Sequence, residues 1–148
     1  MRVFVTGASG HIGLPVVREL LAAGHKVVGL ARSDAAAEKI SSAGAEVRRG
    51  TIDDLDGLKE AARSADGVIH LAFKHDLALV SGDFAGAMAA DLRSVQAIGE
   101  ALVDSAKPFV NTTGTMLLAH SVRDRAGTEE DEGQAGGNPR VASEALSL

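Results

Sequence analysis

Short apolar runs alternate along the chain with longer segments in which apolar residues recur every three or four positions. The runs predict buried strands, and the longer segments predict helices with one buried face. The predicted strands cover residues 2–5, 26–31, 46–49, 66–73 and 108–113. Strands that alternate with helices form a parallel sheet covered on both faces, so the pattern predicts an α/β fold with a doubly wound parallel sheet.

The predicted helices lie between these strands and carry recognisable end signals. They cover residues 10–23, 34–44, about 54–65 and 83–106. Gly24 is the expected stop of the first helix, Asp34 is the expected cap of the second, and either Asp54 or Asp56 caps the third. Residues 120–139 are rich in charge and glycine, which predicts a loop.

The most informative segment is the turn between the first strand and the first helix. Its glycines, Gly7, Gly10 and Gly13, have the spacing G-x-x-G-x-x-G. Glycines allow a tight turn and let a pyrophosphate approach the backbone without meeting a Cβ atom. The helix that follows points unpaired N–H groups at the anion. The segment predicts a dinucleotide-binding Rossmann fold with strand order 3-2-1-4-5, and the alternative is a tight turn without a ligand.

The end of the second strand predicts which nucleotide is preferred. A carboxylate at this position binds the 2′-hydroxyl of NAD, whereas a basic residue suits the 2′-phosphate of NADP. Arg32 lies 19 residues beyond Gly13, and Ser33 beside it can donate a further hydrogen bond. We therefore expect NADP rather than NAD. The alternative is an exposed arginine that binds nothing.

Composition narrows the classes of function. The net charge of −5 gives no electrostatic support for a nucleic-acid partner. The chain has no cysteine, which excludes disulfides, thiolate catalysis and zinc–thiolate sites. No apolar run reaches the length of a membrane span, and the chain starts with a strand instead of a signal peptide. We therefore expect one cytoplasmic domain that binds no membrane.

Three segments of the chain resemble the short-chain dehydrogenase/reductase superfamily, above all its extended and atypical branches with the NAD(P)-dependent epimerase/dehydratase proteins. They read T-G-A-S-G-H-I-G near the N-terminus, A-R-S after the second strand and A-D-G-V-I-H-L-A-F at the fourth. The resemblance implies that the cofactor is bound by Gly7, Ala8, Ser9, Gly10, His11, Ile12, Gly13, Arg32, Ser33, Thr51, Ile52, Leu71, Ala72, Phe73 and Thr113. Thr51 departs from the family pattern, which has an acidic residue beside the adenine.

The same resemblance implies catalysis by an Asn, a Ser or Thr after the fifth strand, and a Tyr-x-x-x-Lys on the next helix. Asp91 falls near the Asn position, and Thr115, with Thr113 as a near alternative, matches the hydroxyl position. Arg140 and Glu144 stand where the tyrosine and the lysine are expected, and the chain has no tyrosine. Arginine stays protonated near neutral pH, so the usual proton relay is absent. A surface pair between Arg140 and Glu144 is the alternative explanation of these two residues.

Histidines offer weaker candidates. His70 lies near the end of the fourth strand, where it could face a substrate, but a buried and hydrogen-bonded histidine is the preferred interpretation. His75 and Asp76 follow in a predicted loop and could supply an acid or a base. The five histidines show no metal-ligand spacing, so no metal site is predicted.

The resemblance implies an oxidoreductase or epimerase-like protein that uses NADP for hydride transfer to or from a small carbonyl or hydroxyl substrate. Members of this branch are usually much longer, so residues 1–148 are expected to be the NAD(P)-binding domain without the substrate-binding part. The substrate therefore stays unknown. The alternatives are a non-catalytic NADP-binding redox sensor and an inactive fragment. A homodimer through the helix at 83–106 is a further expectation from the resemblance.

Overall fold

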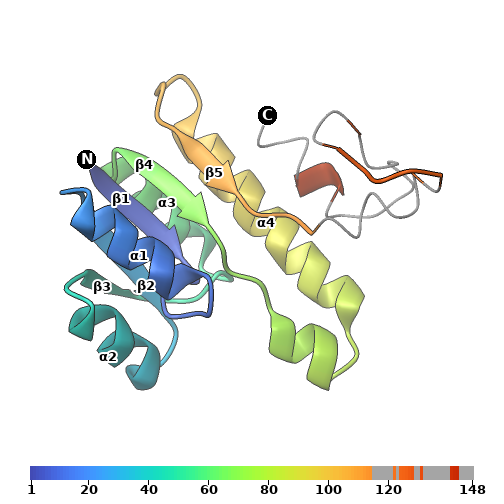
Figure 1. Cartoon of the computed structure of the whole chain (residues 1–148), viewed down its shortest axis with the longest axis horizontal. Coiled ribbons are helices and arrows are strands. Elements are labelled where there is room, and N and C mark those ends of the chain that lie inside the picture. The colour runs from blue at the N-terminus through green and yellow to red at the C-terminus, as the bar shows by residue number, and fades with distance from the viewer. Residues whose placement is uncertain (115–121, 123, 129–130, 132–140, 144–148) are drawn as a thin grey trace.

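The computed structural model describes residues 1–114, 122, 124–128, 131 and 141–143 (Figure 1). In this part of the chain one parallel sheet has the order β3-β2-β1-β4-β5, so the predicted fold class and strand order are confirmed. The strands are β1 Arg2–Thr6, β2 Lys26–Ala31, β3 Glu46–Arg49, β4 Gly67–His70 and β5 Phe109–Asn111. Both β4 and β5 are shorter than the sequence predicted.

Helices cover both faces of the sheet. These are α1 Gly13–Ala22 and α2 Asp34–Ser42 on one face and α3 Leu55–Ser64 and α4 Phe84–Leu102 on the other, whereas the π-helix η1 Asp76–Val80 follows β4 and packs against α4. Because successive side chains of a strand point to opposite faces, β1 contributes to two cores. Phe4 packs under α3 and α4, whereas Val3 and Val5 pack under α1 and α2.

Several helix ends differ from the expected ones. The cap of α2 is Ser33, whose Oγ accepts a hydrogen bond from the Ala36 N–H at 3.2 Å, so the assignment to Asp34 was wrong. The extended backbone of Ser33 lets its side chain reach back to the first turn. Asp54 caps α3 by accepting from the Gly57 N–H at 3.0 Å, which decides between the two predicted caps.

The first helix begins at Gly13 and not at residue 10, because the residues between them form the turn that follows β1. The fourth helix ends at Leu102 and not at 106. Asp104 and Ala106 have positive φ angles of 59° and 52°, which no helix accommodates. The π-helix η1 occupies a segment that was expected to be a loop.

The long helix α4 uses much of its apolar face within the chain. Val95, Ile98 and Leu102 are buried, whereas Phe84 at its start is 51% exposed. Dimerisation through this helix stays a prediction. Among the described residues no helix combines the length and the apolar character needed to cross a membrane.

Candidate dinucleotide site

A cleft of about 930 Å³ lies at the carboxyl ends of β1, β2 and β4. The sequence-predicted residues that line it are Gly7, Ser9, Gly10, His11, Ile12, Gly13, Arg32, Ser33, Thr51, Ile52, Leu71, Ala72 and Phe73. Ala8 is fully buried in the core, and Thr113, beyond β5, is not among the lining residues. The cleft is therefore where a doubly wound fold binds its ligand, and most of the predicted cofactor residues meet there.

The glycine turn is held in shape by backbone contacts. Gly7 has a φ of +67°, and a Cβ atom on it would lie 2.8 Å from the Ala72 nitrogen. A Cβ atom on Gly13 would lie 2.0 Å from the Gly7 carbonyl oxygen. Both positions therefore require glycine for the turn itself, before any ligand is considered. At Gly10 a Cβ would meet only the Gly7 oxygen, at 3.1 Å, so its other side is open to the cleft. This cradle of bare backbone fits a pyrophosphate.

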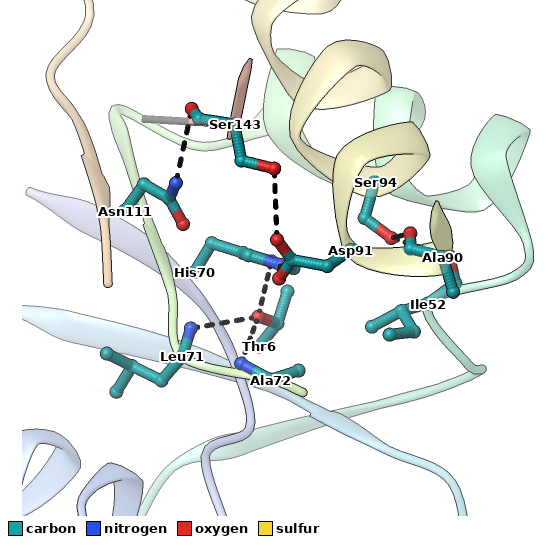
Figure 2. Close-up of polar contacts among 10 residues, drawn as sticks. All are labelled: Thr6, Ile52, His70, Leu71, Ala72, Ala90, Asp91, Ser94, Asn111 and Ser143. Atoms are coloured by element: carbon teal, nitrogen blue, oxygen red, sulfur yellow. Dashed lines mark hydrogen bonds and ion pairs between the residues drawn. The ribbon is translucent and has the colours of Figure 1, made fainter. Parts of the chain in front are cut away.

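Thr6, the last residue of β1, joins the floor of the cleft to β4. Its Oγ1 accepts hydrogen bonds from the N–H groups of Leu71 and Ala72, each at 3.2 Å (Figure 2). These two bonds use both lone pairs of the hydroxyl oxygen, so its proton is left to donate to Nδ1 of His70, 2.8 Å away. In this arrangement Nδ1 of His70 is the acceptor of the contact.

His70 and Asp91 form a buried pair behind this floor. Nε2 of His70 lies 3.7 Å from Oδ1 of Asp91, and both side chains are 1% exposed. The other carboxylate oxygen of Asp91 accepts from Oγ of Ser143 at 3.1 Å, and the carbonyl of Ser143 accepts from Nδ2 of Asn111 at 3.5 Å (Figure 2). The interpretation of His70 as buried and hydrogen-bonded is confirmed. Asp91 does not line the cleft, and its catalytic role stays a prediction.

The remaining catalytic candidates fall into two groups, those outside the described residues and those that line the cleft. Thr115, Arg140 and Glu144 lie outside the described residues. His75 and Asp76 both line the cleft, with Asp76 in the first turn of η1 instead of a loop.

Charged pairs bridge the rim of the cleft. Nη2 of Arg32 lies 2.5 Å from Oδ2 of Asp76, with the two side chains 66% and 71% exposed. Nζ of Lys74 lies 2.7 Å from Oδ2 of Asp53. Lys74 and the first residue of η1 are thus tied to the segments that follow β3 and β2 by ion pairs, of which the Arg32–Asp76 pair is largely open to solvent.

Three residues whose side chains help to form the cleft were not identified from the sequence. Lys39 of α2 lines the cleft together with Arg32 and Ser33. Its signal was its position four and three residues beyond Ala35 and Ala36, which line the cleft as well. Ser94 of α4 lies within hydrogen-bond distance of the Ile52 carbonyl, at 3.0 Å, and of the Ala90 carbonyl of its own helix, at 2.8 Å, so its one proton is shared between α4 and the loop that follows β3. The hydroxyl of Thr6 had no sequence signal, because its partners are at least 64 residues away.

The fold and the cleft define a protein of the Rossmann nucleotide-binding class. A model of the NmrA-like family matches residues 1–108, and the chain belongs to this family. It is 43% identical over 148 residues to the uncharacterized protein C2A9.02 of Schizosaccharomyces pombe, covering 100% of this chain and 48% of that protein. The chain spans about half the length of the first curated relatives that it matches.

Two further similarities concern proteins with a stated activity or ligand. Over 72 residues, 49% of this chain and 22% of the other, it is 40% identical to the sterol-4-alpha-carboxylate 3-dehydrogenase, decarboxylating, of Dictyostelium discoideum. The fold matches that of the Bordetella bronchiseptica enzyme WbmG in complex with NAD and UDP, with a TM-score of 0.78 and 20% identity. That match covers 99% of this chain and 49% of the other. The family model confirms the resemblance to the short-chain dehydrogenase/reductase superfamily, and the structural match confirms the Rossmann fold.

Proposed function

We propose that this chain binds NADP(H) in preference to NAD(H), with the pyrophosphate at the glycine turn and the adenosine 2′-phosphate at Arg32. The observation that carries the proposal is the position of Arg32, Ser33 and Lys39 at one side of the cleft. A guanidinium and an ammonium group attract a phosphate, and Ser33 has a hydroxyl proton to donate while its oxygen caps α2.

The remaining cleft residues have matching roles in the proposal. All five of the residues involved line the cleft. In the proposal Thr51 and Ile52 contact the adenine, and Leu71, Ala72 and Phe73 contact the nicotinamide side. The nicotinamide supplies hydride chemistry when bound, and the chain supplies its position. We propose an oxidoreductase or epimerase-like reaction on a small carbonyl or hydroxyl substrate, with Thr115 as the substrate-facing hydroxyl and Asp91 as a catalytic candidate.

Titration calorimetry of the 148-residue chain with NADPH and NADH tests the cofactor proposal. We expect NADPH to bind more tightly, because only NADPH brings the 2′-phosphate to Arg32. Arg32→Gln should remove most of the difference by weakening NADPH and leaving NADH nearly unchanged. Equal affinities of the unmodified chain for the two nucleotides would overturn the preference, and absence of binding would overturn the site.

A non-catalytic NADP-binding redox sensor is the second candidate. It is favoured by the absence of tyrosine from the chain, which removes the proton donor of the usual mechanism. Oxidation of NADPH in proportion to a reduced product would decide for the enzyme. Tight NADPH binding without turnover across carbonyl substrates would favour the sensor.

A further inference from the structure

We propose that Asp76 is a specificity-determining residue that weakens the preference for NADP by competing with the 2′-phosphate for Arg32. This inference rests on the proposed binding of the phosphate at Arg32. Its starting point is the contact of 2.5 Å between Nη2 of Arg32 and Oδ2 of Asp76, which joins residues 44 positions apart.

The carboxylate of Asp76 is held at the cleft by the anchoring of η1. Ala78 of this helix is 1% exposed, and Leu77 accepts a hydrogen bond through its carbonyl from the Asp83 N–H at 3.0 Å. On the other side, Lys74 pairs with Asp53. Asp76 therefore stays near Arg32 through the backbone as well as through its own ion pair.

A phosphate at Arg32 and the carboxylate of Asp76 oppose each other in two ways. They share one guanidinium, and each carries negative charge, so their proximity is unfavourable. Arg32 has five N–H donors, and its contact with Asp76 uses Nη2. The guanidinium can therefore bind the phosphate and the carboxylate together, but the two anions then lie close to each other and repel. The 2′-hydroxyl of NAD has no such conflict, because a carboxylate accepts hydrogen bonds from ribose hydroxyls.

The expected effect is modest because the pair is exposed. Side chains that are 66% and 71% exposed are well solvated, and ion pairs of this kind are weak. Freeing Arg32 from such a pair corresponds to a gain of about two- to five-fold in affinity. Asp76 thus adjusts the preference for NADP without reversing it.

Calorimetric titration of Asp76→Asn with NADPH and NADH tests the proposal. The amide has nearly the same shape without the charge, and the exposed position makes a folding defect unexpected. We expect NADPH to bind about two- to five-fold more tightly than in the unmodified chain and NADH to bind equally or more weakly. In the Arg32→Gln background the same substitution should lose the part of its effect that comes from competition for the guanidinium and keep only the part that comes from repulsion between the two anions.

Asp53→Asn is the matched control. It removes one negative charge from the rim of the same cleft, but from the partner of Lys74 and not of Arg32. It should therefore change the affinities for NADPH and NADH by the same factor and leave the ratio of the two affinities unchanged. If the unmodified chain prefers NADPH and Asp76→Asn leaves the ratio of the NADPH affinity to the NADH affinity unchanged, the role of Asp76 alone is overturned. A higher ratio in Asp76→Asn, with no preference in the unmodified chain, would support that role while overturning the proposed preference. A chain that binds neither nucleotide would overturn both.

Discussion

The floor and the rim of the cleft are built in opposite ways. The floor, made of Thr6, Gly7, Gly13 and the Leu71–Ala72 backbone, is held by hydrogen bonds to a buried hydroxyl and by backbone contacts that exclude a Cβ atom. The rim is held by ion pairs between side chains that are largely exposed, such as Arg32 with Asp76. The comparison teaches that the shape of the site belongs to the fold, whereas the proposed choice of nucleotide depends on contacts that contribute little to folding.

The largest effect is expected from Gly13→Ala in the floor. The added Cβ would lie 2.0 Å from the Gly7 oxygen, a backbone atom that cannot move without distorting the turn. We expect the free energy of unfolding to fall by about 3 kcal/mol or more, at the upper end for overpacking. Chemical denaturation measures this change.

Gly99→Ala is the control for that variant. Gly99 lies within α4, and a Cβ there has no heavy atom within 4 Å. Alanine is the better helix former, so the free energy of unfolding should rise by about 0.5–1 kcal/mol. Equal destabilisation by the two variants would contradict the steric argument for the turn.

Thr6→Val should have an intermediate effect. Valine keeps the shape of threonine but leaves the N–H groups of Leu71 and Ala72 without their side-chain acceptor and His70 Nδ1 without its donor. We expect a loss of about 2–3 kcal/mol in the free energy of unfolding. Thr6→Ser keeps the hydroxyl and should lose only about 1 kcal/mol for the missing methyl group. If serine were as damaging as valine, packing and not hydrogen bonding would explain the role of Thr6.

The smallest effect is expected at the rim, from Lys74→Gln. The pair with Asp53 involves side chains that are 28% and 51% exposed. Its loss should change the free energy of unfolding by no more than about 1 kcal/mol. A thermal unfolding scan measures the change in stability. A loss of stability as large as that of Thr6→Val would contradict the proposed difference between floor and rim.

The sequence predicted those parts of the molecule that depend on local pattern. The period of the apolar residues predicted the parallel sheet, and the glycine spacing predicted the turn, because both are properties of neighbouring positions. The cap of α2 was misplaced by one residue, since Ser33 and Asp34 are both good caps and only the backbone conformation distinguishes them.

Side-chain partners across the fold could not be predicted in this way. Arg32 was predicted to be a phosphate ligand, and this role stays a prediction, but its pairing with Asp76 depends on η1, whose π-helical turn has no distinct sequence signal. The pairing of His70 with Thr6 likewise depends on the register between β1 and β4, in which Thr6 lies opposite His70. Such contacts arise only once strands and loops have been placed in space.

The close backbone packing of Gly7 and Gly13 also has a consequence for the entropy of ligand binding. A turn whose backbone already fits against Leu71 and Ala72 has few conformations to lose when an anion arrives. Its hydrogen-bond donors can therefore contribute nearly their whole interaction energy to affinity. At the rim, the arriving nucleotide must first reorganise existing ion pairs. The conformational entropy of the cleft thus favours tight binding of the middle of a dinucleotide, and the proposed discrimination at its adenosine end is a smaller contribution to affinity.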